Sequence, residues 1–187
     1  AAMRVGPVGL FYGTAPEDKL AAAAAASAEL THCHPLGREG AVLIALAVAS
    51  ARDDRDSLSI CRHLAGRARA DHFRNRLEVA ASWLRAGIPP DPAATAARLG
   101  HGIAAVDSCV TAIYLALAFR EEDFLAMLDF AVQVGGDVDT IAAMAGAVWG
   151  AARGEQALPG SCLDQLEERE RLRELAAALA AAGDQGT

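Results

Sequence analysis

The chain has 187 residues, of which 53% are apolar, and its formal net charge at pH 7 is −7. This length and composition predict a folded chain with one sizeable core and exclude a disordered one. The acidic balance disfavours non-specific binding to nucleic acid or to anionic membranes, and no apolar run reaches the ~18 residues of a membrane span. Aromatic residues make up only 5%, so we expect closely packed helices with small side chains in the core.

Helices are predicted along nearly the whole chain, and no segment is a convincing strand. Two segments, Pro35–Arg52 and Ser108–Phe119, are apolar on most faces, which is typical of buried central helices. The break at Gly87–Pro92 is too short to separate domains, so residues 1–187 are predicted to form a single all-α domain. The other expected helices are Glu17–Leu30, Asp56–Ala70, Asp71–Ala86, a short one through Arg98, Glu121–Val134, Asp137–Ala152 and one or two within Cys162–Ala182.

The four cysteines have none of the spacings that bind zinc or haem. They are Cys33, Cys61, Cys109 and Cys162. We expect free thiols in a reducing compartment, which predicts a cytoplasmic protein.

Two aspartates and a threonine follow a pair of glycines, because residues 135–140 read Gly-Gly-Asp-Val-Asp-Thr. Glycine tolerates the left-handed conformation that ends a helix, and acids are favoured at the start of the next one. Asp137 and Asp139 are separated by one residue in a turn, so both carboxylates can point the same way, and Thr140 adds a neutral oxygen. Mg²⁺ and Ca²⁺ prefer such oxygen ligands. The alternative is an aspartate that only caps the helix, although one acid would suffice for that.

The string Gly135–Ala147 resembles the signature of the ADP-ribosylglycohydrolase family, which includes the dinitrogenase reductase-activating glycohydrolases. Three more segments resemble family motifs in the family's order: Ala2–Leu10, Leu30–Ala41 and Leu99–Tyr114. The last looks most like the subgroup that removes ADP-ribose from serine and cleaves related O-linked ADP-ribose. The resemblance covers residues 1 to about 165 and implies the C-terminal part of an all-α, orthogonal helical bundle.

The resemblance also implies a function and a set of site residues. It implies a hydrolase that uses two Mg²⁺ ions to cleave ADP-ribose from a modified protein or another ADP-ribose conjugate. By this resemblance, Asp137 and Asp139 are catalytic and, with Thr140, bind metal, whereas His32, Gly102 and Ile103 contact the substrate. We expect His32 and the loop of Gly102 to lie near the aspartates, because loops gather at one end of a bundle. The linkage cleaved and the oligomeric state stay open.

Several family features have no counterpart in these 187 residues. The family has an upstream glutamate, a Thr/Ser-Asp-Asp-Thr segment and a glycine-rich phosphate loop, whereas the single Asp-Asp pair here, Asp53–Asp54, is wrongly placed. His101 replaces the usual asparagine between two glycines. We therefore expect the C-terminal half to two-thirds of such an enzyme, with weak Mg²⁺ binding, little activity and an exposed apolar surface along Val42–Val48 or Thr111–Ala118. The alternatives are a non-catalytic remnant that binds a nucleotide or a partner, and a plain helical domain with structural aspartates.

Overall fold

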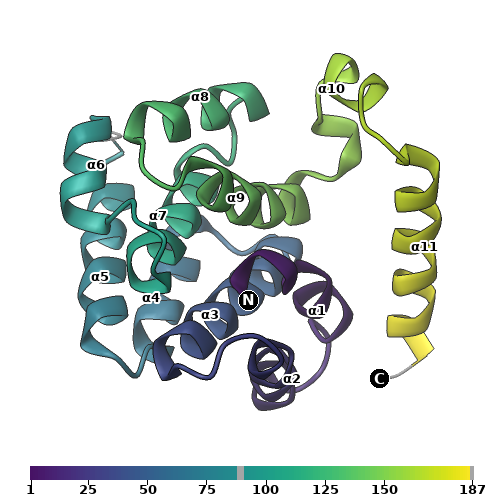
Figure 1. The fold of residues 1–187 in the computed structure, drawn as a ribbon, viewed down its shortest axis with the longest axis horizontal. Coiled ribbons are helices and arrows are strands. Elements are labelled where there is room, and N and C mark those ends of the chain that lie inside the picture. The colour runs from purple at the N-terminus through teal and green to yellow at the C-terminus, as the bar shows by residue number, and fades with distance from the viewer. Residues whose placement is uncertain (88–90, 186–187) are drawn as a thin grey trace.

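Helices make up almost all of the regular structure in the computed structural model, which describes residues 1–87 and 91–185 (Figure 1). These residues contain no strand, so the predicted all-α fold is confirmed. The predicted break at Gly87–Pro92 lies partly outside the described residues. In chain order the elements are η1 (Ala2–Arg4), α1 (Gly6–Phe11), α2 (Glu17–Glu29), α3 (Pro35–Arg52), α4 (Ser57–Arg67), α5 (Asp71–Ala86), α6 (Pro92–Leu99), α7 (Ala105–Ala118), α8 (Phe124–Val134), α9 (Val138–Arg153), η2 (Glu155–Ala157), α10 (Gly160–Asp164) and α11 (Arg169–Gln185).

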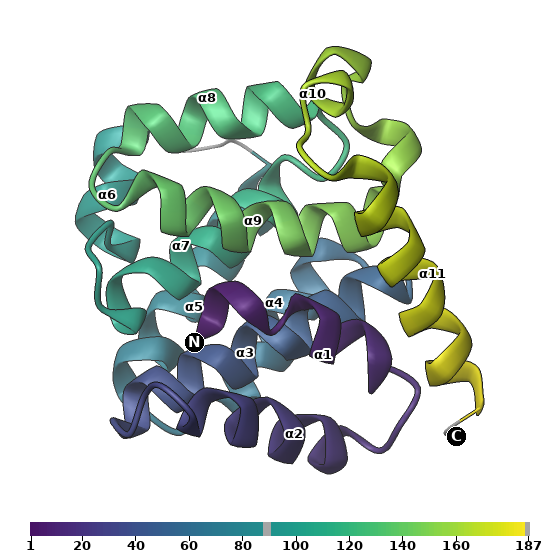
Figure 2. The same ribbon diagram turned by 45° about the vertical axis from the view of Figure 1, so that its right-hand side comes forward.

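The two helices that the sequence predicts to be central lie in the core. All residues of α7 from Ser108 to Leu117 are buried, and so are all residues of α3 from Gly40 to Ala51 except Val42. Helix α3 packs against α1, α2, α4, α7 and α9, and α7 packs against α5 and α9 as well (Figure 2). The exposed apolar surface expected along Val42–Val48 or Thr111–Ala118 is therefore wrong, because neighbouring helices of this same chain cover both segments except Val42 and Ala118, which are half-buried.

Several helices begin at residues other than those predicted. Helix α8 begins after Asp123, whose carboxylate accepts the N–H of Leu125 at 2.7 Å, and not at Glu121. Helix α7 begins at Ala105 and has no side-chain cap, so the predicted start at Ser108 is wrong. Asp107 lies inside its first turn, where its carboxylate accepts a hydrogen bond from the guanidinium of Arg76 at 2.8 Å. The predicted helices also did not include α1.

Helices α1 and α3 approach closely enough for their backbones to touch. A Cβ placed on Gly9 would lie 2.6 Å from the carbonyl oxygen of Ala45 and 2.9 Å from the Cβ of Val48. This contact fits the expectation of a core built from small side chains.

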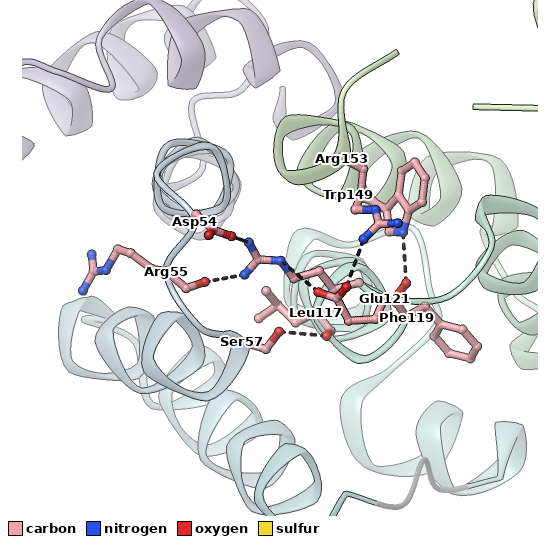
Figure 3. Close-up of polar contacts among 9 residues, drawn as sticks. Asp54, Arg55, Ser57, Leu117, Phe119, Glu121, Trp149 and Arg153 are labelled. Carbon is pink, nitrogen blue, oxygen red and sulfur yellow. Dashed lines mark hydrogen bonds and ion pairs between the residues drawn. The ribbon is translucent and has the colours of Figure 1, made fainter. Parts of the chain in front are cut away.

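A polar network joins the C-terminal ends of α3, α7 and α9 (Figure 3). Arg120, which is 8% exposed, donates to the carbonyl oxygen of Arg55 and to the carboxylate of Asp54. The buried indole of Trp149 donates from Nε1 to the carbonyl oxygen of Phe119 at 3.0 Å. These bonds join the segments that follow α3 and α7 to each other and to α9.

Helix α11 stands apart from the other helices along most of its length (Figure 1). It packs on α1, where Gly183 meets the backbone of Phe11, and its side chains Leu172 and Leu175 are 49% and 58% exposed. Across the described residues, none of the helices is both long enough and apolar enough to cross a membrane.

The close crossing of α1 and α3 predicts opposite effects for two glycine-to-alanine changes. Gly9→Ala should lower the free energy of unfolding by about 1–3 kcal/mol, because its methyl group meets the backbone of α3. Gly150→Ala, within α9, should be neutral or stabilising by up to about 1 kcal/mol, because no atom lies within 4 Å of its Cβ position. Urea denaturation measures both, and equal effects of the two changes would contradict the close crossing.

Candidate functional site

The candidate site is built on the turn between α8 and α9. Gly135 ends α8, as predicted, and Gly135 and Gly136 have φ values of +76° and +74°, which disfavour other residues. Asp137 occupies the N-cap position of α9, but its side chain makes no capping hydrogen bond. The structure therefore does not support the alternative in which Asp137 is only a helix cap.

The carboxyl groups of Asp137 and Asp139 lie together at the start of α9. A hydrogen bond with the Asp137 carboxyl is the main reason why the pKa of Asp139 lies below its usual value, and the backbone N–H of Thr140 lowers it further. Asp139 is exposed, whereas Asp137 and Thr140 are half-buried. Both acids also lie where the dipole of α9 favours negative charge.

This donor set suits a hard cation but is incomplete. Two carboxylates and a hydroxyl are oxygen ligands of the kind that Mg²⁺ prefers. Among the described residues, no group of three or more His, Cys, Asp or Glu side chains could hold a metal ion. The turn therefore supplies part of a coordination sphere at most, and its metal-binding role stays a prediction.

The loop at residues 100–103 lies directly against this turn. The backbone N–H of Asp137 donates to the carbonyl oxygen of His101 at 2.8 Å. A Cβ on Gly136 would overlap this carbonyl group, so the contact requires glycine. The structure thus brings Gly102 and its neighbours to the aspartates, as expected, while their contact with a substrate stays a prediction.

The same loop is held from its other side by α5 and α7. The buried hydroxyl of Thr111 donates to the carbonyl oxygen of Gly100 at 2.5 Å. The guanidinium of Arg76 donates to the Asp107 carboxylate at 2.8 Å and to the carbonyl oxygen of Val106. The sequence did not reveal these supports, because Arg76 lies 31 residues from its partner.

Ile103 is the most exposed large apolar side chain of this loop. It is 86% exposed, in a loop whose first two residues are held by the Thr111 hydroxyl and the Asp137 N–H. Two surface grooves, one between α4 and α5 and one between α2, α3 and α4, are lined neither by this residue nor by the aspartates.

His32 lies in the connection between α2 and α3 and is exposed. The hydroxyl of Thr31 lies 2.8 Å from its Nδ1 and accepts a hydrogen bond from Arg4 at 2.9 Å. His34 is the residue that caps α3, since its Nδ1 accepts the N–H of Leu36. No hydrogen bond among the described residues joins His32 to the turn of Asp137, so a shared cleft stays a prediction.

All four cysteines are free thiols in the structure. Burial raises the pKa of Cys61 and of Cys109 to about 12, which makes these two thiols poor nucleophiles at neutral pH. Cys33 and Cys162 are exposed.

Comparison with known proteins identifies the family. The family model described as ADP-ribosylglycohydrolase matches residues 1–187, and the chain belongs to this family. It is 32% identical to human ADP-ribosylhydrolase ARH3, over 95% of this chain and 56% of the human protein. It is 34% identical to an uncharacterized protein of Archaeoglobus fulgidus, over 96% of this chain and 56% of that protein. The chain therefore spans about half the length of the curated relatives that it matches.

The contact between the turn and the loop predicts different effects for two neighbouring glycines. Gly136→Ala should unfold more readily than Gly135→Ala and lose hydrogen-exchange protection at the Asp137 amide, because its methyl group overlaps the His101 carbonyl. Gly135→Ala carries only the cost of a backbone conformation (φ +76°, ψ −162°) that other residues rarely adopt, about 1–3 kcal/mol, since nothing lies within 4 Å of its Cβ position. Retained protection of the Asp137 amide in Gly136→Ala would show that the loop does not hold the turn.

The hydroxyl of Thr111 gives a second test of the loop's support. Thr111→Val should lower the free energy of unfolding by about 1–3 kcal/mol and speed hydrogen exchange in residues 100–103, because the buried Gly100 carbonyl loses its donor. Thr95→Val is the matched control, since the Asp91 carbonyl that its hydroxyl contacts also accepts the Thr95 N–H. Similar losses in both variants would mean that the bond to Gly100 has no special role.

Proposed function

We propose that this chain forms part of the active site of an ADP-ribosylhydrolase, which hydrolyses the glycosidic bond between ADP-ribose and a modified protein or another conjugate. The family match over residues 1–187 carries this proposal. The relative named ADP-ribosylhydrolase ARH3 supports it, as does the turn that brings two carboxyl groups together at the start of α9. The free cysteines support a cytoplasmic location.

In this proposal Asp137, Asp139 and Thr140 are metal ligands. The Asp139 carboxylate is the form that binds a cation, and the hydrogen bond with the Asp137 carboxyl, together with the Thr140 N–H, lowers the pKa of Asp139 and favours that form. When bound, Mg²⁺ supplies positive charge that polarises a water molecule and orients the ribose. The His101 carbonyl fixes the turn through the Asp137 N–H, so the two carboxylates are oriented before a ligand arrives.

We assign substrate contacts to Gly102, Ile103 and His32. Ile103 offers a fixed apolar surface, and Gly102 lets a ligand approach the backbone closely. The Thr31 oxygen accepts from Arg4, so its own proton is free to donate to His32 Nδ1. That bond orients the imidazole ring for a contact with a ligand.

The incomplete donor set leads us to propose low activity for the 187 residues alone. With two acidic ligands, most Mg²⁺ positions are left to water, so binding is weak. The alternative is a non-catalytic domain that binds a nucleotide or a partner. It would have the same turn, so only a measurement of catalysis distinguishes the two functions.

Calorimetry on the 187-residue chain tests the metal site. We expect weak Mg²⁺ binding that Asp139→Asn weakens by about tenfold or more, because one negative charge leaves the ligand set. Asp129→Asn is the control, since Asp129 is an exposed aspartate of α8 that bonds only Gln133 at 2.8 Å. Equal binding by both variants would remove Asp139 from the metal site.

Release of ADP-ribose from an O-linked conjugate, with and without Mg²⁺, tests the activity. We expect ADP-ribose to bind and turnover to be slow or absent. Robust turnover by this chain would contradict the incomplete site and would assign catalysis to other acids. Tight binding of ADP-ribose with no turnover at any Mg²⁺ concentration would favour the non-catalytic alternative.

A further inference from the structure

Positive charge is concentrated on the hairpin formed by α4 and α5. Residues 57–86 contain six arginines and two acidic residues, and the rest of the chain contains 11 basic and 22 acidic residues. A basic surface on an acidic protein attracts negatively charged partners to one place.

A groove of about 370 Å³ lies between these two helices. Its polar lining consists of Arg62 from α4 and Arg74, Glu78 and Arg85 from α5. Arg74 is engaged within the chain, because it binds the Asp71 carboxylate at 2.6 Å. Among the described residues, Arg62, Glu78 and Arg85 have no hydrogen-bond or ion-pair partner, so their charges are available to a ligand.

A second groove, of about 750 Å³, runs between α2, α3 and α4. Alanines of α2 and the side chains Val42, Leu43 and Leu46 of α3 form its apolar lining. Its charged lining consists of Asp18, Arg38, Glu39, Arg67 and Arg69. Arg38 pairs with Glu29, and Glu39 accepts the backbone N–H groups of Arg69 and Ala70. This groove explains why Val42 is only half-buried within an otherwise buried helix. Arg67 at its rim pairs with Glu17, whereas the side chain of Arg69 has no partner among the described residues.

Gly66 lines both grooves and connects them. It lies in the last turn of α4, is exposed, and no atom lies within 4 Å of its Cβ position. Glycine destabilises a helix relative to alanine, and packing inside this chain does not require it here. Its missing side chain leaves the backbone of α4 open where the two grooves meet.

We propose that the two grooves together bind an acidic polypeptide segment of another protein. Its carboxylates pair with Arg62, Arg85 and Arg69, its apolar side chains lie against the alanines and Val42, and its backbone crosses α4 at Gly66. A nucleic acid fits less well, because Glu78 in the first groove and Asp18 and Glu39 in the second would repel a continuous run of phosphates, whereas the carboxylates of a polypeptide can be spaced to avoid them. This proposal does not depend on the hydrolase function.

Fluorescence anisotropy with a labelled peptide of five Glu-Glu-Leu-Ala repeats tests the proposal. We expect Arg62→Glu with Arg85→Glu to weaken binding about tenfold or more, because two favourable charge pairs become repulsive. The control pair, Arg98→Glu with Arg171→Glu, makes the same change in net charge at exposed arginines of α6 and α11 and should change binding less than twofold.

A variant that adds bulk without changing the charge tests whether the shape of the grooves contributes to binding. Gly66→Leu keeps the charge unchanged, has room to fold, and should also weaken binding several-fold by filling the junction. Equal weakening by the two double variants, no binding at millimolar peptide, or tighter binding of a 20-nucleotide RNA than of the peptide would each overturn the proposal. Self-association in light scattering that Arg62→Glu with Arg85→Glu abolishes would assign the surface to a second copy of the chain and overturn it as well.

Discussion

The mutual packing of α3, α7 and α9 determines where every part of the candidate site lies. Each of these helices contacts the other two, and the contact between α3 and α7 is close: a Cβ on Gly40 would lie 2.9 Å from the sulfur of Cys109 and 3.0 Å from the Cβ of Ala105. Because such close contacts tolerate little shift, the starts of α7 and α9 have fixed positions. The loop before α7 and the turn before α9 therefore meet, and the His101 carbonyl reaches the Asp137 N–H.

The two ends of α9 differ in how their polar groups are bonded. At its C-terminal end, buried Trp149 and the buried guanidinium of Arg120 satisfy backbone carbonyls of neighbouring segments. At its N-terminal end, Asp137 provides no side-chain cap and two carboxyl groups lie together. There the hydrogen bond between the two carboxyl groups, the backbone N–H of Thr140 and the dipole of α9 all favour the ionised form of Asp139.

Local signals in the sequence were sufficient for the parts of the fold that depend on neighbouring residues. The apolar character of Pro35–Arg52 and Ser108–Phe119 on most faces predicted buried helices, and the paired glycines predicted the end of α8. The sequence does not predict which elements cover those buried helices, because an apolar helix indicates that other elements pack on it without indicating which ones. The contacts Arg76–Asp107 and His101–Asp137 join residues more than 30 positions apart, so no local sequence pattern predicts them.

Helix α5 connects the candidate site with the proposed docking surface while keeping the two apart. At 100° per residue, Arg76 and Arg85 lie on opposite sides of the helix axis, and Arg74 and Glu78 lie on the side of Arg85. Arg76 binds the first turn of α7, directly after the loop at residues 100–103, whereas the other three line the groove. A polypeptide bound in the groove would therefore lie across α5 from the aspartates and leave them accessible. The same helix can then hold a partner and support the candidate active site at once.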